Sequence, residues 1–491
     1  MAKAGRDAHG KITGHGAYGT GREVCRPYIT SHPSIELPQP PATFEKFGMT
    51  ALELLEDVVT RARKAGADNV DAVMFDSASL SVSNRLGERE NIERSESRDL
   101  GLRVLIGKQQ AIVSSSDTAS HALDELVERA VAMAKAASED PYCGLADSNL
   151  LAQTFPDLDL LDSEEPSTET LIASAAATED SARSVTGITN SEGASASWGR
   201  SGIALYTSHG FHGTYAASRH STAVAVIAGE GTAMERDWEY SSARHAIDLD
   251  APEDIGRLAA ERTVRRLNPR KVASSQVPII FEPRVASSLV RHLAGAITGT
   301  SVARGTSFLK EKMGEAVFRE GIEIVDDPHR PRGLGSKPFD AEGVANRRYT
   351  LVDDGKLATW LLDSSSARQL GLTTTGHAGR GTASPPSPGT SNLYMTAGEQ
   401  TPTALMSDIA EGLYVSDLIG FGVNGVTGDY SRGAAGFWIE NGELCYPVSE
   451  LTIAGNLKDM FKALTPANDL VFRHGTDAPT IRIDGMTVAG T

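Results

Sequence analysis

Glycine is the residue that most constrains the fold of this chain. It occupies 48 of 491 positions, whereas aromatic residues make up only 6% of the sequence. Glycine is unfavourable inside helices, and it permits tight turns and the close approach of two backbones. This balance predicts a turn-rich protein rather than a helical bundle. The densest cluster, residues 420–442, contains seven glycines and is predicted to lie outside any helix.

Helical and alternating apolar patterns both occur between residues 50 and 137. Thr50 and Glu53 form a capping box, which is typical of a helix start, and apolar residues at helical spacing continue to Gly66. The following apolar patterns predict four strands and a closing helix, at 70–76, 79–85, 100–106, 110–114 and about 117–137. A helix, an antiparallel β-meander and a second helix make a compact α+β module.

The rest of the chain divides by composition. Residues 1–49 hold five of the 22 prolines and show no amphipathic period, which predicts a disordered extension or a start codon upstream of the true one at Met49. A solvated acidic connector is expected near 155–169, within an N-terminal α+β domain that covers 50–270. From 275 to 491 the sequence is rich in glycine and in strand patterns. It predicts a large, mostly antiparallel β domain, and the fold class is α+β.

The composition excludes several classes of protein. Lys and Arg number 47 against 64 Asp and Glu, a net charge of −17, and a dedicated nucleic-acid binder needs clustered cations. No apolar run approaches the ~20 residues that cross a bilayer. The three cysteines lie far apart without a C-x-x-C pair, which suits a reducing cytoplasm. Cys445 lies in an apolar run and is expected to be buried.

The strong local motifs of hydrolases and nucleotide-binding proteins do not occur. The sequence contains no H-E-x-x-H, no G-x-S-x-G and no G-x4-G-K-[ST]. One G-x-G-x-x-G stands at 420–425, but the glycines that follow cannot form the helix that a dinucleotide site requires.

Three histidines that lie close in sequence, His209, His212 and His220, suggest a metal site. On one strand, however, His209 and His212 would point to opposite faces, and no carboxylate lies at a useful spacing nearby. Hydrogen-bonded or surface histidines are the simpler interpretation. His292 lies on a predicted helix whose apolar residues recur every four positions, which favours packing over metal binding.

The chain contains several long and distinctive segments, most of them in its C-terminal third. They are Gly425–Gly442 (GVTGDYSRGAAGFWIENG), Tyr446–Val448, Ile453–Met460, Ile481–Met486 and, earlier, Asn190–Gly199, Arg332–Gly335, Pro338–Asp340 and Ser391–Tyr394. Together and in this order they resemble the PmbA (TldE) proteins of the TldD/PmbA metallopeptidase family. The resemblance covers about residues 50–491.

The resemblance implies a zinc peptidase family, from which this chain departs. In the TldD branch a helix with H-E-x-x-x-H supplies two zinc ligands and the general base, and a cysteine near the C-terminus completes the site. The corresponding helix here is 283–297, and aligning the last histidine on His292 places Ser287 and Ser288 where His and Glu belong. No cysteine lies between Asn468 and Ile481. The resemblance therefore implies no catalytic residue and no metal ligand set or cofactor in this chain.

The resemblance also implies partners. It predicts a cytoplasmic heterodimer in which this PmbA/TldE-type subunit joins a zinc-carrying TldD-type sister subunit around extended or unfolded peptides, with no nucleic-acid or membrane partner. Three polar residues of the glycine cluster are expected either at the substrate chamber or subunit interface or in a purely structural turn: Asn424, Asp429 and Arg432. Two alternatives stay open. One is a non-proteolytic regulatory binding protein, and the other is a self-sufficient metallopeptidase with an unorthodox site drawn from His209, His212, His220 or His377.

Overall fold

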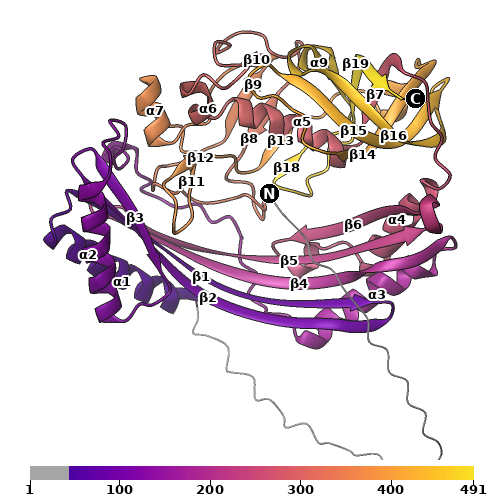
Figure 1. Ribbon diagram of the computed structural model, residues 1–491. Helices are drawn as coiled ribbons and strands as arrows, with labels where there is room; N and C mark the ends of the chain where they lie inside the picture. Colours follow the sequence, from indigo (N-terminus) through magenta and orange to yellow (C-terminus); the bar gives the residue numbers. More distant parts are fainter. Residues whose placement is uncertain (1–43, 491) are drawn as a thin grey trace, which may run out of the picture. The chain divides into compact units, whose positions relative to one another are not determined.

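The computed structural model describes residues 44–490 (Figure 1). Residues 1–43 of the extension predicted for residues 1–49 lie outside the described part of the chain. Helix α1 (Phe44–Lys64) begins at Phe44 and not at Thr50, so the predicted start of the first helix is wrong. Once the packed part of a helix has formed, each further residue adds a backbone hydrogen bond at low cost, and Thr50 therefore lies inside α1.

The first half of the described chain forms one six-stranded antiparallel sheet with strand order β3-β2-β1-β4-β5-β6. Its strands are β1 (Asn69–Arg85), β2 (Glu88–Ile106), β3 (Gln109–Ser115), β4 (Ile188–Thr207), β5 (His212–Ala228) and β6 (Glu235–Ala243). The predicted strands 70–76 and 79–85 are one continuous strand, β1. The predicted helix–meander–helix module is confirmed as α1, β1–β3 and α2 (Ser120–Ala136).

The two faces of this sheet have different coverings. Helices α1, α2, α3 (Thr168–Ser184) and α4 (Pro252–Arg265) lie along one face of the sheet, with α3 visible below it in Figure 1. Leu80 and Val82 of β1 pack against α3 on that face. On the opposite face Val73 packs against Phe339 of the C-terminal half. Because side chains alternate along a strand, Ser79, Ser81 and Ser83, which alternate with Leu80 and Val82, lie on this opposite face.

The C-terminal half builds a second six-stranded sheet, of order β16-β15-β14-β7-β19-β17, in which an added β16–β19 pairing closes the sheet on itself. These strands are β7 (Ser275–Phe281), β14 (Glu411–Ile419), β15 (Asp429–Glu440), β16 (Glu443–Asn456), β17 (Leu464–Pro466) and β19 (Ile481–Ala489). Only the β7–β14 pair is parallel within this sheet. The prediction of a mostly antiparallel β region is confirmed.

Smaller elements complete the C-terminal half. A five-stranded sheet has the order β10-β9-β8-β13-β18; its strands are Ile324–Asp326 (β8), Tyr349–Asp353 (β9), Lys356–Leu357 (β10), Leu393–Met395 (β13) and Thr476–Asp477 (β18). Two short strands, Ala378–Gly379 (β11) and Ser387–Pro388 (β12), form a separate pair. The helices are Pro283–Ala296 (α5), Gly299–Ala303 (α6), Ser364–Leu370 (α7), Pro402–Met406 (α8) and Leu457–Ala463 (α9). Helix α5 contacts β14, β13 and β18 and so lies between the two C-terminal sheets.

The acidic segment near 155–169 is largely exposed but is held at definite points. Leu158 and Leu160 are buried against Ala217 of β5, and a carboxylate oxygen of Asp162 accepts a hydrogen bond from the backbone N–H of Ala246 at 3.0 Å. The expectation of a purely solvated connector is therefore too simple, because two leucines among the acids anchor the segment to the sheet.

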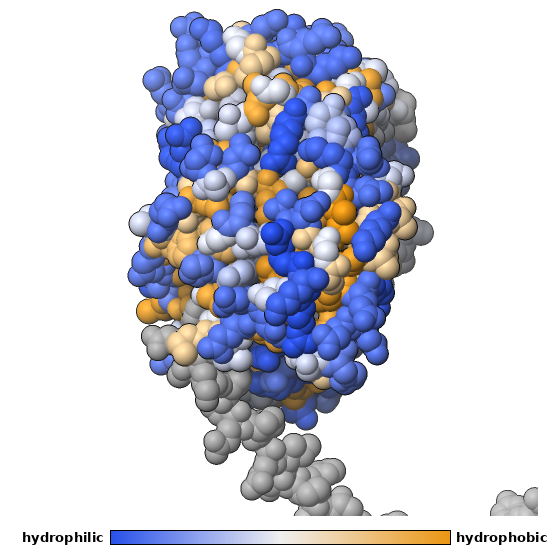
Figure 2. Space-filling model, turned by 90° about the vertical axis from the view of Figure 1, so that its left-hand side faces the viewer, coloured by the Kyte–Doolittle hydropathy of each residue, from blue (hydrophilic) through white to orange (hydrophobic). Residues whose placement is uncertain are grey.

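The molecular surface in Figure 2 is mainly hydrophilic, with hydrophobic residues in scattered patches on the face shown. Among residues 44–490, no helix combines the length and the apolarity that crossing a membrane requires.

Candidate functional site

Helix α5 and the glycine-rich loop between β14 and β15 border a cavity of about 320 Å³. Arg291 and His292 of α5 line it, together with Phe421 and Val423 of the loop and Arg432 of β15. The structure thus brings together two positions singled out in the sequence for different reasons, the remaining histidine of the degenerate motif and the arginine of the glycine cluster.

The position of His292 follows from how α5 packs. The helix starts with Pro283 in its first turn and buries an apolar stripe that includes Leu289 and Leu293. His292 stands on the flank of this stripe, half-buried, with its ring edge toward the ring of Tyr430 at a centroid distance of 6.0 Å. Its Nε2 is buried and has no hydrogen-bond partner in the described part of the chain.

His292 is uncharged near neutral pH. Burial, together with the positive charges of Arg432 and Arg291, lowers the pKa of its imidazole to about 4. A neutral imidazole keeps one N–H donor and one lone pair. The cavity therefore contains a polar group that is neither charged nor hydrogen-bonded through Nε2.

The two arginines beside His292 have few partners. Arg432 donates from Nη2 to the Leu418 carbonyl at 3.2 Å, and Arg291 donates from Nη1 to the hydroxyl of Ser287 at 3.0 Å. Across residues 48–490, the ion pairs within 4.0 Å include neither of these guanidinium groups. The charge on this side of the cavity is thus positive.

Ser287 and Ser288, the other two positions of the degenerate motif, point their hydroxyls at their own helix. Ser287 Oγ donates to the Arg284 carbonyl at 3.2 Å, and Ser288 Oγ donates to the Val285 carbonyl at 2.6 Å. Both serines are buried. A hydroxyl that bonds a backbone carbonyl of the preceding turn satisfies itself locally, so neither serine presents an oxygen to the cavity.

Asn424 and Asp429 shape the glycine-rich loop and do not line the cavity. Asn424 Oδ1 accepts hydrogen bonds from the backbone N–H groups of Val426 (2.9 Å) and Thr427 (3.3 Å). Asp429 accepts from the Thr427 hydroxyl at 2.6 Å and from Asn456 Nδ2 at 3.0 Å, and these bonds lower the pKa of Asp429. Of the three polar residues singled out in the sequence, only Arg432 lines the cavity.

Glycine is required at one point of this loop by close backbone approach. A Cβ on Gly422 would lie 1.8 Å from the carbonyl oxygen of Ser431. The loop is thereby pressed against the start of β15. Apolar side chains at the end of β14 and in the loop are exposed: Ile419 is 64% exposed, Phe421 100% and Val426 55%. Exposed apolar side chains gathered on one loop are typical of binding surfaces.

The other histidines have separate partners on separate elements. His209 lies in the turn between β4 and β5 and not on a strand, so the expected geometry of His209 and His212 is wrong. No carboxylate lies near His220 in sequence, but the fold places Asp162, from a distant part of the chain, 3.2 Å from its Nε2. His377 Nε2 lies 3.3 Å from Asp326. Within the described residues, no three His, Cys, Asp or Glu side chains are grouped as a metal site requires.

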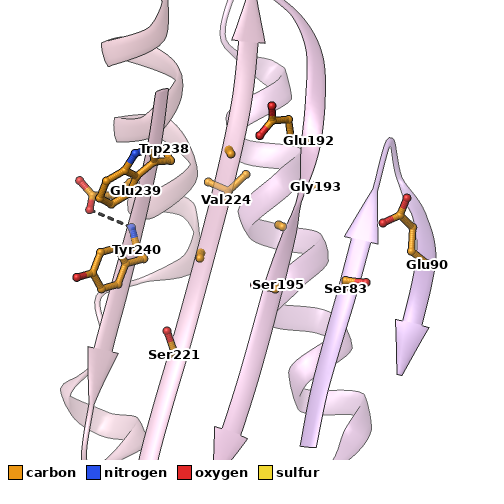
Figure 3. Close-up of a pocket in the computed structure, with 13 residues that line it drawn as sticks. Ser83, Glu90, Glu192, Gly193, Ser195, Ser221, Val224, Trp238, Glu239 and Tyr240 are labelled. Atoms are coloured by element: carbon orange, nitrogen blue, oxygen red, sulfur yellow. Dashed lines mark hydrogen bonds between the residues drawn. The ribbon is translucent and has the colours of Figure 1, made fainter. Parts of the chain in front are cut away.

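A second pocket, of about 420 Å³, opens on the sheet face away from α3 and α4 (Figure 3). Ser83, Ser195 and Ser221 lie along its floor on β1, β4 and β5. Trp238 and Tyr240 of β6 stand at one side with their rings stacked at 5.5 Å. The sequence showed the serine alternation on β1 but not that neighbouring strands would place serines beside it.

Cys445 is exposed, contrary to the expectation of burial. It lies on β16, where side chains alternate between the two faces of the sheet, and its neighbours in sequence take the covered positions. An apolar run therefore predicted the strand correctly but not which of its residues is covered.

Comparison with known proteins gives consistent matches over most of the chain. Three family models match in order: PmbA/TldA metallopeptidase domain 1 at residues 70–134, the central domain at 161–267 and the C-terminal domain at 274–490. "Metalloprotease PmbA" of Escherichia coli O157:H7 is 40% identical over 89% of this chain and 96% of its own length. A "Metalloprotease PmbA homolog" of Haemophilus influenzae is 40% identical over 88% of this chain and 94% of its own.

Solved structures share the fold. A crystal structure from Bacteroides thetaiotaomicron has a TM-score of 0.83 and 26% identity, and the match covers 89% of this chain and 98% of that one. TldE from Thermococcus kodakarensis has a TM-score of 0.80 and 21% identity over 89% of this chain and 100% of its own.

Proposed function

The chain belongs to the PmbA/TldD metallopeptidase family, and we propose that it is the subunit of a cytoplasmic TldD/PmbA-type peptidase complex that binds substrate without holding the zinc. A TldD-type sister subunit with H-E-x-x-x-H would carry the metal. The substrates would be extended or unfolded peptides, which both subunits together would enclose.

The observation that carries this proposal is the environment of α5, the helix that corresponds by resemblance to the zinc helix. Zinc sites in proteins use imidazole, thiolate or carboxylate ligands. Here the two motif serines bond backbone carbonyls of α5, and the one histidine stands beside two arginines. Two positive charges next to a single imidazole repel a divalent cation. The residues present do not fit a zinc ion.

The chain's own groups suit peptide binding instead. The cavity beside α5 combines apolar walls with unpaired arginines, and the pocket on the N-terminal sheet combines serine hydroxyls with two stacked aromatic rings. Hydroxyls can donate to or accept from peptide backbone groups, and aromatic rings supply apolar area at low cost in side-chain entropy. Neither the cavity nor the pocket requires a particular peptide sequence for these contacts.

Expression of this chain alone and together with an H-E-x-x-x-H sister from the same genome tests the proposal. We expect the purified chain alone to contain no stoichiometric zinc and to leave an unfolded peptide uncut. The two chains together should elute as one complex, contain about one zinc ion per pair and cleave the peptide. A variant of the sister with Gln in place of the motif Glu should form the same complex without cleavage, which provides the matched control.

Two results would overturn the proposal. Stoichiometric zinc with peptidase activity in the isolated chain would establish a self-sufficient metallopeptidase. Failure to bind the sister, combined with stable binding to an unrelated protein and no cleavage, would establish a regulatory binding protein.

A further inference from the structure

The cavity beside α5 has an unbalanced charge. Of the residues that line it, only Arg291 and Arg432 are charged near neutral pH, and no acid is among them. Two more deeply buried arginines elsewhere in the protein are paired with acids: Arg284 donates to Asp237 at 2.7 Å, and Arg266 lies 3.4 Å from Glu235. Arg291 is exposed, but Arg432 is partly buried and its Nε is shielded from solvent. A charge that is partly withdrawn from water normally has an acidic partner, and Arg432 has none among the residues that line the cavity.

The neighbouring tyrosines do not supply that negative charge. Burial raises the pKa of Tyr430, whose ring contacts His292, to about 12. Burial also raises the pKa of Tyr240, which lies near Arg291. Both phenols are therefore protonated near neutral pH, and the positive charge of the two arginines is not neutralised from within the described part of the chain.

Two buried nitrogen atoms at the cavity also have no partner. Nε2 of His292 and Nε of Arg432 are both shielded from solvent and form no hydrogen bond with any residue that the structure describes. Leaving a buried polar group without a partner is destabilising, because the group has lost its hydrogen bonds to water. Proteins retain such groups where a ligand or an ordered water satisfies them.

Most of the remaining lining is apolar, with Ser301 and Thr306 as its two hydroxyl-bearing residues. Phe308 and Leu457 line the cavity from the body of the domain, and Val423 and the exposed Phe421 border it from the loop. A volume of about 320 Å³ lies within the range of ligand-binding pockets and exceeds what a simple inorganic anion fills. The cavity therefore fits a carboxylate that carries an apolar group.

We propose that this cavity binds the C-terminal carboxylate of a peptide, with Arg432 and Arg291 holding the carboxylate and the apolar walls holding the side chain of the last residue. A guanidinium group can bind a carboxylate through two parallel hydrogen bonds, which also fixes the direction of the ligand. Capture of a chain terminus is an established mode of peptide recognition. The identity of the ligand as a peptide rests on the proposed function, whereas its carboxylate chemistry rests on the cavity alone.

Peptide binding to the full-length chain, purified without a sister, tests the inference by fluorescence polarisation. The probes are two labelled unstructured peptides that end in phenylalanine, one with a free carboxylate and one with a C-terminal amide. The free carboxylate should bind about tenfold or more tightly than the amide, since a hydrogen bond to a charged group is worth this much. Arg432→Gln should reduce binding of the acid peptide by a similar factor and leave binding of the amide unchanged.

Matched variants keep the test decisive. Arg129→Gln on the exposed face of α2 changes the net charge equally and should leave binding unchanged. Arg432→Lys should recover part of the affinity, because it keeps the charge but loses the planar fork. Circular dichroism and thermal unfolding establish that each variant is folded.

Three outcomes would overturn the inference: equal binding of acid and amide peptides, equal binding by the unsubstituted chain and a folded Arg432→Gln variant, or displacement of the acid peptide by inorganic phosphate at equal concentration. The last would assign the cavity to small anions. If acid and amide peptides bind equally but the zinc-containing pair still cleaves peptides, this inference fails and the proposed function stands. If the acid peptide binds more tightly but the chain forms no complex with a zinc-carrying sister, the proposed function fails and the carboxylate site stands.

Discussion

Two histidines of the C-terminal half stand in opposite kinds of surroundings. His377 is buried, with Nδ1 at 2.8 Å from the Thr375 hydroxyl and Nε2 at 3.3 Å from Asp326. Asp326 also accepts from the backbone N–H and the hydroxyl of Ser391, at 2.8 and 2.6 Å. His292, by contrast, faces a cavity with Nε2 unpartnered.

The difference in hydrogen bonding between the two histidines indicates which one serves the fold and which one is available to a ligand. A buried polar network whose members are all satisfied specifies and stabilises the fold, whereas unsatisfied groups around a cavity reduce stability. Functional sites commonly retain such costs, because the groups must remain available to a ligand. The His377 cluster therefore belongs to the architecture, and the His292 cavity is the place to look for binding.

The largest expected effect comes from breaking the satisfied cluster. Asp326→Ala removes the acceptor of three donors and leaves them buried without a partner, which should lower the free energy of unfolding by about 3 kcal/mol. Urea denaturation measures the change. As a control, Asp57→Ala breaks only the exposed pair with Arg61 and should cost less than about 1 kcal/mol. Equal effects in both variants would remove the contrast between the two histidines.

Acid should destabilise the protein through His292. Its pKa is about 4 in the folded chain against an ordinary 6.5, so the unfolded chain takes up the proton first as the pH falls. The stability that depends on neutral His292 is fully present above pH 6.5 and is lost as the pH falls from 6.5 to 4. By pH 5 the free energy of unfolding should have fallen by about 2 kcal/mol. Urea denaturation at pH 7 and pH 5 should show this loss in the unsubstituted chain and a correspondingly smaller one in His292→Leu. An identical pH dependence in both would contradict the assignment.

The same substitution at the two histidines should have opposite signs at pH 7. His292→Leu removes an unpartnered nitrogen from an apolar wall and should raise the free energy of unfolding by about 1 kcal/mol. His377→Leu removes one buried hydrogen-bond partner from each of Asp326 and Thr375 and should lower the free energy of unfolding. Thermal and urea unfolding of the pair of variants compares them directly, and destabilisation by both would mean that His292 is also a structural residue.

The smallest effect concerns the degenerate motif. Ser287→His with Ser288→Glu recreates H-E-x-x-x-H along α5, yet Arg432 still faces His292, so we expect only weak zinc binding in competition with a chromophoric chelator. Adding Arg432→Gln should strengthen it by about threefold by removing one repelling charge. Tight zinc binding that does not depend on Arg432 would show that the serines alone exclude the metal.

Much of the fold could be predicted from local pattern. The recurrence of apolar residues every four positions predicted a helix around His292, and the resemblance placed it at 283–297 against the observed Pro283–Ala296. The alternation of Leu80 and Val82 with serines correctly predicted a strand with one covered face. Local periodicity suffices where an element's own residues decide which face is buried.

The candidate site could be predicted only in part. The sequence pointed to His292 and Arg432 for separate reasons, and their convergence on one cavity depends on how α5 packs beside β15. The partner of His220, Asp162, lies on a distant loop and has no sequence signal. Contacts between residues far apart in sequence follow from tertiary packing, which local patterns do not contain.

A crystal of the complex with the sister subunit, grown with a peptide that ends in a free carboxylate, tests the central claim most directly. Anomalous diffraction at the zinc absorption edge locates the metal without assumption. We predict a zinc peak on the H-E-x-x-x-H helix of the sister, none beside His292, and the carboxylate of the peptide against Arg432. A zinc peak bound to His292 of this chain would contradict the account.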